Sequence, residues 1–216
     1  MKEKKEFVVG GILFTGFIAL LIMVLCVDVK AIGPEGSEIG LSWLNKNVFE
    51  TIGTSETWHS ITGILGDVVM FFPVLFAAIG VVQLIKRKSF KGVDLDLYYL
   101  AGFYVVMMAS YFLFEKVIIN YRPVLDDGKL EASFPSSHTL LAVCIMGTTI
   151  IQIGKRIKNK NTKVILHIFS AILMAVIVVG RLLAGVHWLT DILSGLLMGL
   201  AYVFIYAGLV KNISES

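Results

Sequence analysis

The chain has 216 residues, of which 56% are hydrophobic and only 16% are charged, and its mean hydropathy is +0.82. A soluble domain carries about 25% charged residues, so this composition excludes an ordinary soluble enzyme and predicts a polytopic membrane protein. The net charge of +3 gives no sign of a nucleic-acid partner. Cys26 and Cys144 both lie inside apolar runs, which predicts free, buried thiols rather than a disulfide or a metal site.

Six apolar stretches are predicted to cross the membrane as helices. Each holds about 20 residues, which at ~1.5 Å per residue spans a hydrocarbon layer of ~30 Å. A backbone in hydrocarbon must satisfy its own hydrogen bonds, which favours helices over isolated strands. We therefore expect an all-α fold in which residues 1–216 form a single six-helix membrane domain. The stretches cover residues 7–27, 61–85, 97–118, 134–154, 164–184 and 188–210.

The connector between the first two stretches, residues 28–60, is too long for a simple turn. Apolar and polar residues alternate in it as in a helix that lies on a membrane surface, so we expect an interfacial helix here. Trp43, Trp58 and Trp188 all fall at the same predicted boundary, where an aromatic belt would place them.

The distribution of Lys and Arg predicts the orientation. An excess of these residues marks cytoplasmic segments. Thirteen of the 19 fall on one side of the predicted membrane, in residues 1–6, 86–96, 155–163 and the C-terminal tail, and four fall in connectors 28–60 and 119–133. We therefore expect a multi-pass protein of the cell membrane with both termini in the cytoplasm. The two connectors and the turn near residues 185–187 are then extracytoplasmic.

The first cluster of ionisable residues lies at the outer end of the third stretch. It contains Lys116 and Arg122, and Pro123 pushes Arg122 toward an extended conformation. Ionisable residues near a span are costly and are therefore candidates for function. Lys116 alone is also compatible with a lysine that extends to the membrane interface.

The second cluster opens the fourth stretch. Pro135 followed by Ser136 and Ser137 is typical of a helix start, and His138 falls in the first turn. A helix N-terminus offers free N–H groups and partial positive charge, which suits a phosphate group. The alternative for this pattern is simple capping of the helix.

The third cluster joins the last two stretches. Arg181 ends one helix, Gly185 makes the turn, and His187 begins the next. His187 and Asp191 are four residues apart, so we expect them on one helix face. A carboxylate bonded to one ring nitrogen fixes the histidine tautomer and leaves the other nitrogen basic, as a nucleophile requires. A purely structural His–Asp pair is the alternative.

The predicted topology brings all three clusters to the same outer boundary. The forks of Arg122 and Arg181 suit a tetrahedral oxyanion. His138, His187 and Asp191 could in principle bind zinc, but the flanking arginines favour an anion. We therefore expect neither a metal nor a cofactor.

At this point the chain resembles the type 2 phosphatidic acid phosphatase superfamily of membrane lipid phosphatases. The family motifs are K-x6-R-P, P-S-G-H and S-R-x5-H-x3-D, in that order. Arg122-Pro123 matches the end of the first motif, and residues 135–138 match the second with Ser137 in place of glycine. Residues 181–191 match the third motif, preceded by Gly180 in place of serine.

One departure concerns the first motif. The position of its lysine is occupied by Glu115, and Lys116 follows one residue later, which is a rotation of ~100° on a helix. The resemblance implies a metal-independent lipid phosphatase that forms a phosphohistidine. It implies that His187 is the nucleophile, Asp191 orients it and His138 protonates the leaving oxygen. The implied phosphate-binding residues are Arg122, Arg181, Ser136, Ser137 and, more loosely, Lys116.

The implied substrate is a lipid phosphate in the surrounding bilayer. An outward-facing site favours undecaprenyl diphosphate, with phosphatidylglycerophosphate and phosphatidic acid as alternatives. Three other classes were considered: a lipid phosphotransferase, a membrane sensor with a decayed site, and a transporter. Clustering of the ionisable residues at one boundary disfavours a transporter, whose binding site lies near mid-membrane. The sequence leaves the oligomeric state open.

Overall fold

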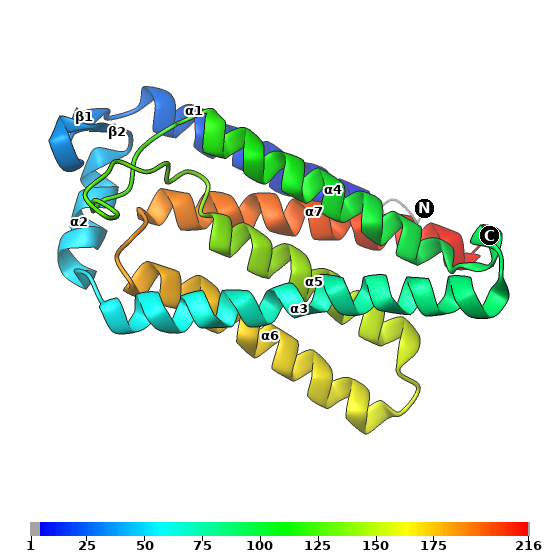
Figure 1. The fold of residues 1–216 in the computed structure, drawn as a ribbon. Helices are drawn as coiled ribbons and strands as arrows, with labels where there is room; N and C mark the ends of the chain where they lie inside the picture. The colour runs from blue at the N-terminus through cyan, green and yellow to red at the C-terminus, as the bar shows by residue number, and fades with distance from the viewer. Residues whose placement is uncertain (1–4, 216) are drawn as a thin grey trace.

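The computed structural model describes residues 5–215 as a bundle of long helices (Figure 1). The chain opens with α1, a small hairpin and a short helix. These are α1 (Lys5–Cys26), β1 (Lys30–Ala31), β2 (Glu38–Ile39) and α2 (Ser42–Ile52). Five further helices complete the bundle: α3 (Glu56–Arg87), α4 (Leu95–Lys116), α5 (Ser137–Arg156), α6 (Lys160–Leu183) and α7 (Leu189–Glu215).

The six predicted spans are confirmed. Six helices in the described chain are long and apolar enough to cross a membrane, so the fold is that of an all-α polytopic membrane protein. The largest difference from the predicted ranges is at α3, which begins at Glu56. The first turn of α3 is polar, so hydropathy does not identify it as part of the span. Ser55 caps this turn by accepting a hydrogen bond from the Trp58 N–H at 3.4 Å.

The expected helix between the first two spans is α2. It lies across one end of the bundle, and the preceding hairpin pairs Lys30 with Ile39 (Figure 1). The hairpin was not predicted, because strands of two residues give no alternating pattern.

Two predictions of residue environment are wrong. Trp188 is buried, with 2% of its surface exposed, and its indole N–H donates to the Tyr121 carbonyl at 2.8 Å, so it does not belong to an aromatic belt. Trp43 on α2 does lie exposed. Cys144 is buried and free as expected, but Cys26 is exposed at the end of α1, where the outer face of a peripheral helix is turned away from the bundle.

The core lies along α5 and α7. Helix α5 is the most enclosed, with Val143, Cys144, Ile145 and Met146 fully buried, whereas α3 exposes large apolar side chains such as Phe71. Close approach of α7 to the start of α5 depends on Gly195, because a Cβ there would lie 2.9 Å from the Ser136 carbonyl oxygen. This contact places the start of α7 directly against the start of α5.

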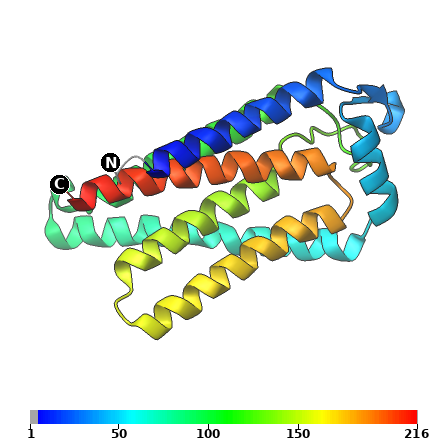
Figure 2. The same cartoon turned by 180° about the vertical axis from the view of Figure 1, so that it is seen from behind.

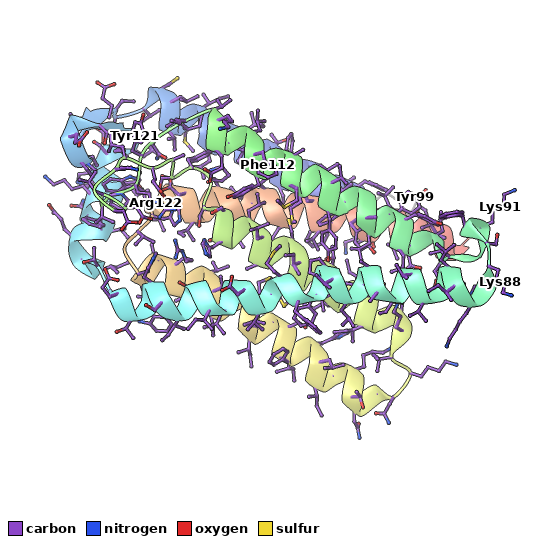
Figure 3. All side chains as sticks on the ribbon, viewed as in Figure 1. Lys88, Lys91, Tyr99, Phe112, Tyr121 and Arg122 are labelled. Atoms are coloured by element: carbon purple, nitrogen blue, oxygen red, sulfur yellow. The ribbon has the colours of Figure 1, made fainter. Side chains whose placement is uncertain are left out.

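The two ends of the bundle differ in what they carry. The described ends of the chain and the α3–α4 connection lie at one end, and the α5–α6 connection points the same way (Figures 1 and 2). The opposite end carries α2, the hairpin, the α4–α5 loop and the α6–α7 turn. Figure 3 shows the contrast, with Lys88 and Lys91 at the first end and Tyr121 and Arg122 at the second. The three clusters singled out in the sequence therefore meet at one end.

Candidate active site

His187 and Asp191 are connected through a third side chain. The Nδ1 atom of His187 lies 3.8 Å from the nearer Asp191 carboxylate oxygen, which is too long for a hydrogen bond. The Ser133 hydroxyl lies between them, 3.1 Å from Nδ1, and donates to Asp191 Oδ2. The expected carboxylate–histidine pairing is therefore made through Ser133.

This arrangement determines the tautomer of His187. A serine hydroxyl has one hydrogen, and Ser133 uses it on Asp191, so toward His187 it can only accept. Nδ1 must then carry the proton, and the lone pair lies on Nε2. Nε2 is buried and has no partner within residues 5–215. Burial lowers the pKa of His187 to about 4, against the opposing effect of the Asp191 carboxylate, so the ring is neutral at neutral pH.

The Asp191 carboxylate is fully buried and held from several directions. One oxygen accepts from the Asn120 amide at 3.1 Å, and the other accepts from the Trp188 backbone N–H at 2.8 Å as well as from Ser133. The Asp191 carbonyl also accepts from the Ser136 N–H at 3.0 Å. These bonds fix the carboxylate and tie the start of α7 to the start of α5.

His187 lies in the turn before α7 and not on the helix itself, which corrects the expected placement. Helix α7 begins at Leu189, so Asp191 in its first turn reaches back toward the ring. The turn depends on Gly185, which has φ +67°, and a Cβ there would collide with the Gly53 carbonyl oxygen. Glycine at this position lets the turn pack against the segment that leads into α3.

Arg181, in the last turn of α6, is one of the largest fully buried side chains, at 1% exposure. Its guanidinium forms no ion pair with a carboxylate among the described residues. Nη1 instead contacts His59 Nδ1 at 3.3 Å and Thr62 Oγ1 at 3.5 Å. Buried charges in proteins are normally paired with an opposite charge. Arg181 therefore offers an uncompensated positive charge to an anion.

Arg122 is held in a different way. It lies in the α4–α5 loop, where its guanidinium pairs with Asp126 at 2.8 Å and with Glu131 at 3.2 Å. Both carboxylates are partly exposed, and Arg122 is largely covered, with 14% of its side chain exposed. Figure 3 shows Arg122 on the loop at the site end. The same loop thus supplies both the cation and its resting counterions.

The start of α5 completes the site. Ser136 is the N-cap residue, Ser137 opens the helix and His138 follows in the first turn, as predicted. His138 lies within electrostatic range of Arg181, His187 and Arg122. The Ser136 hydroxyl and the Nδ1 atom of His138 are buried without a partner in the described part of the chain. The predicted catalytic and arginine residues are therefore brought together.

Lys116 is not brought to this group. It is exposed at the last residue of α4, whereas Glu115 lines a small cavity together with Ser133, Ser137 and His187. The helical rotation of one residue explains the difference. Phosphate contact by Lys116 stays a prediction, and the carboxyl group of Glu115 occupies the position at the cavity wall.

Three residues of the site were missed by sequence reasoning: Ser133, Asn120 and His59. Ser133 belongs to the second cluster but gives no signal beyond a small polar residue. Asn120 precedes Arg122 in a segment already rich in polar residues. His59 lies in a connector far from the three clusters, and only the packing of α3 against α6 brings it to Arg181.

These features define a class: a six-helix membrane protein in which two histidines, two arginines and the N-terminus of α5 gather at one end of the bundle. The family model described as the PAP2 superfamily matches residues 99–215, more than half of the chain. The chain belongs to the PAP2 superfamily. The matched region contains every predicted site residue and excludes α1–α3.

Two individual relatives match this chain over shorter regions and at low sequence identity. Phosphatidylglycerophosphatase B of Bacillus subtilis (strain 168) is 26% identical over 103 residues, 47% of this chain and 49% of the relative. Lipid phosphate phosphatase delta of Arabidopsis thaliana is 33% identical over 76 residues, 34% of this chain and 18% of the relative. The aligned regions thus span about half of the first relative and less of the second.

The fold has a solved counterpart. The crystal structure of a transmembrane PAP2-type phosphatidylglycerolphosphate phosphatase from Bacillus subtilis matches 94% of this chain and 96% of its own, with a TM-score of 0.63 and 20% identity. At that identity the likeness confirms the fold.

Proposed function

We propose that the protein is a membrane lipid phosphatase that transfers the phosphoryl group of a lipid to His187 and then to water. The observation that carries this proposal is that five side chains at the site end of the bundle each have a buried polar atom without a hydrogen-bond partner among the described residues. Native proteins leave few such atoms unpaired. The group comprises Arg122 Nε, Arg181 Nε, His138 Nδ1, His187 Nε2 and Ser136 Oγ. A phosphate group would accept from the arginines and the serine and present phosphorus to His187.

The first step forms a bond between His187 Nε2 and phosphorus and breaks the bond from phosphorus to the lipid oxygen. The lone pair for the attack is the one that the Ser133 contact leaves on Nε2. His138 gives its proton to the leaving oxygen, so that a monoester substrate releases an alcohol instead of an alkoxide, and a diphosphate substrate releases a protonated lipid phosphate. The carboxylate of Asp191, acting through Ser133, stabilises the positive charge that develops on the ring.

The second step reverses the roles. His138, now neutral, accepts a proton from water, whose oxygen attacks phosphorus and breaks the phosphorus–nitrogen bond to release inorganic phosphate. Throughout, Arg122, Arg181 and the N–H groups at the start of α5 stabilise the charge on the phosphoryl oxygens. The arginines supply this charge, and we propose that the reaction needs no metal.

We propose that the site end of the bundle faces the extracytoplasmic side and that the described termini face the cytoplasm. The support is the excess of Lys and Arg at the opposite end, where Lys88 and Lys91 lie (Figure 3). On that side, undecaprenyl diphosphate is one candidate substrate. Phosphatidylglycerophosphate is the second, because the Bacillus subtilis relative is a phosphatidylglycerophosphatase and the structural neighbour is a phosphatidylglycerolphosphate phosphatase.

A phosphate-release panel tests the function. The purified full chain in detergent is given undecaprenyl diphosphate, phosphatidylglycerophosphate and phosphatidic acid, with and without EDTA. We expect release of inorganic phosphate from at least one lipid, with water as the only acceptor and with little change on chelation. Rapid quenching after addition of a ³²P-labelled substrate should leave an acid-labile label on the protein.

Two results would count against the proposal. Phosphate that appears only when a second lipid alcohol is supplied would identify a phosphotransferase. Absence of release from all three lipids, by a protein that remains folded, would favour a sensor. Strong loss of activity on chelation would remove the metal-independent chemistry while leaving the class intact.

A further inference from the structure

His59 is a conspicuous neighbour of the site, because it contacts Arg181 and belongs to none of the three motifs. Its Nδ1 atom lies 3.3 Å from Arg181 Nη1. Arginine carries donors and no acceptor, so the imidazole nitrogen that faces it must present a lone pair. Nδ1 of His59 therefore carries no hydrogen in this arrangement.

Thr62, one turn later on α3, is the second anchor of the same nitrogen. Its hydroxyl donates to the Trp58 carbonyl at 2.7 Å, which leaves a lone pair directed at Arg181 Nη1, 3.5 Å away. Nη1 has two hydrogens, and these two acceptors occupy both. Nε and Nη2 make no hydrogen bond within residues 5–215. The free edge of the guanidinium is the one that can bind two phosphate oxygens side by side.

We propose that His59 is a positioning residue that holds Arg181 by a neutral acceptor, and so fixes its free edge toward phosphate without cancelling its charge. The proposal rests on the proposed function, since it assumes that Arg181 binds the phosphoryl group. A carboxylate in place of His59 would make a stronger bond to the guanidinium, but it would also neutralise the charge that an incoming phosphate needs. Arg122, by contrast, has two carboxylate partners. The same site thus contains one arginine held by charged acceptors and one held by neutral acceptors.

Two variants of His59, which are nearly isosteric with each other and differ in charge, test the proposal. In His59→Asn the amide oxygen lies close to the position of Nδ1 and accepts without charge, whereas in His59→Asp the same position carries a negative charge. The measurements are kcat, KM, the inhibition constant of inorganic phosphate, and thermal stability in detergent. We expect His59→Asn to stay within about threefold of wild type in KM. We expect His59→Asp to be at least as stable and to bind phosphate roughly tenfold to a hundredfold more weakly.

A third variant, His59→Phe, removes the acceptor, and His167→Phe on α6 is the matched control. Loss of a hydrogen bond to a charged group corresponds to a roughly tenfold or larger rise in KM and in the phosphate inhibition constant. A purely structural role for His59 predicts the opposite pattern, in which His59→Asp is the best substitute. Equal phosphate binding by the Asn and Asp variants would overturn the proposal.

Arg181→Gln separates this proposal from the proposed function. If Arg181→Gln binds phosphate as well as wild type, the function assigned to the arginine fails. If Arg181→Gln loses binding while His59→Asp and His59→Phe retain it, only the role of His59 fails.

A second observation concerns a carboxyl group inside a span. Asp67 on α3 is exposed and has no hydrogen bond or ion pair with any described residue. It lines a cavity of about 120 Å³ between α3 and α5, and His138 forms the facing wall. An ionisable residue in a span is costly and therefore a candidate for function. The cavity is apolar elsewhere, lined by Val69, Met70 and Leu141.

We further infer that this cavity is the subsite for the alcohol that leaves the phosphate, and that Asp67 selects an alcohol with a free hydroxyl. His138 is the proposed proton donor to the leaving oxygen and must therefore face the leaving group. The cavity that His138 lines is thus in a position to receive that group. A cavity of about 120 Å³ can hold a group of the size of a three-carbon polyol and is too small for a lipid tail. The Asp67 carboxyl can accept a hydrogen bond from such a hydroxyl. This inference also rests on the proposed function.

The test compares phosphatidylglycerophosphate, whose leaving glycerol has a free hydroxyl, with phosphatidic acid of the same acyl chains, which lacks one. We expect Asp67→Ala to lower kcat/KM for the first lipid roughly tenfold and to leave the second within about twofold. Asp67→Asn, which keeps an acceptor, should fall between wild type and Asp67→Ala. Equal changes for both lipids, or none, would remove the assignment. If wild type hydrolysed undecaprenyl diphosphate but neither of these two lipids, the Asp67 assignment would fail; absence of hydrolysis of all three lipids would count against the proposed function.

Discussion

Two polar clusters lie at opposite ends of the same bundle, and they differ in whether their charged groups have partners of opposite charge. At the end away from the site, Asp96 is 5% exposed and pairs with Arg156 at 2.8 Å and with Lys155 at 3.5 Å. Asp94 pairs with Arg87 at 2.8 Å and accepts from Gln83 at 2.8 Å. At the site end, Arg181 has no carboxylate partner among the described residues, and Nε2 of His187 has no partner.

The difference indicates that the cluster away from the site contributes to stability and the cluster at the site end contributes to function. Cations and carboxylates that satisfy one another tie helices α3, α4 and α5 together, and the cost of burying them is met within the protein. At the site end, the cations and ring nitrogens that lack a partner among the described residues can be paired only by a bound anion. The comparison predicts that substitutions at one end change activity and substitutions at the other change stability.

The largest expected effect is that of His187→Ala. Removal of the nucleophilic nitrogen should lower phosphate release by at least about 10⁴-fold, because no other group can form the covalent intermediate. Helicity and thermal stability should stay close to those of wild type. Appreciable activity in a folded His187→Ala protein would contradict the nucleophile assignment.

The next effect is that of Arg181→Gln. Loss of one preorganised charge-stabilising donor costs about 10²- to 10³-fold in turnover. Since the buried guanidinium lacks a carboxylate partner, its removal should not destabilise the protein and is expected to raise the melting temperature. A fall in both activity and stability would show that Arg181 belongs to a paired, structural cluster.

Asp96→Ala tests the opposite end. Removing one partner of a buried ion pair leaves the cations uncompensated, so the free energy of unfolding should fall by about 3 kcal/mol. The specific activity of the folded fraction should be unchanged. Asp94→Ala is the matched control: its carboxylate is 38% exposed, so we expect a loss below about 1 kcal/mol. Denaturation in detergent, followed by fluorescence, measures both.

The smallest effect concerns pH. An ordinary histidine has a pKa of about 6.5, whereas burial lowers that of His187 to about 4. The nucleophile is active when deprotonated, so activity is present above this value and is lost as pH falls through it. The acid limb of kcat/KM that belongs to His187 should therefore appear below about pH 5. An acid limb centred near 6.5 would show that the ring is less buried than described.

Much of the fold could be predicted from the sequence, because the length of an apolar run and the placement of Lys and Arg are local properties. The same holds for the grouping of Arg122, His138, Arg181 and His187, since parallel spans bring alternate connectors to one end. The contact of His59 with Arg181 could not be predicted, because it depends on how α3 packs against α6. The Ser133 bridge depends on a separation of 3.8 Å that no spacing rule supplies.

The error at Trp188 has the same origin. Trp188 was assigned to the membrane boundary from its position in the chain, but its indole finds a carbonyl inside the protein. The helix turns Lys116 away from the cavity that Glu115 lines, and its phosphate contact stays a prediction. A shift of one residue along α4 is enough to place Glu115, and not Lys116, at the wall of the cavity.

The pairing of Arg122 with Asp126 and Glu131 has a consequence for turnover. A phosphate that binds Nη1 or Nη2 of Arg122 must compete with two carboxylates from the same loop, whereas Nε has no partner among the described residues. After hydrolysis the carboxylates compete with the product for the same donors. If the protein acts as proposed, such a site holds inorganic phosphate less tightly than two arginines without carboxylate partners would, and it releases the product more readily between reaction cycles.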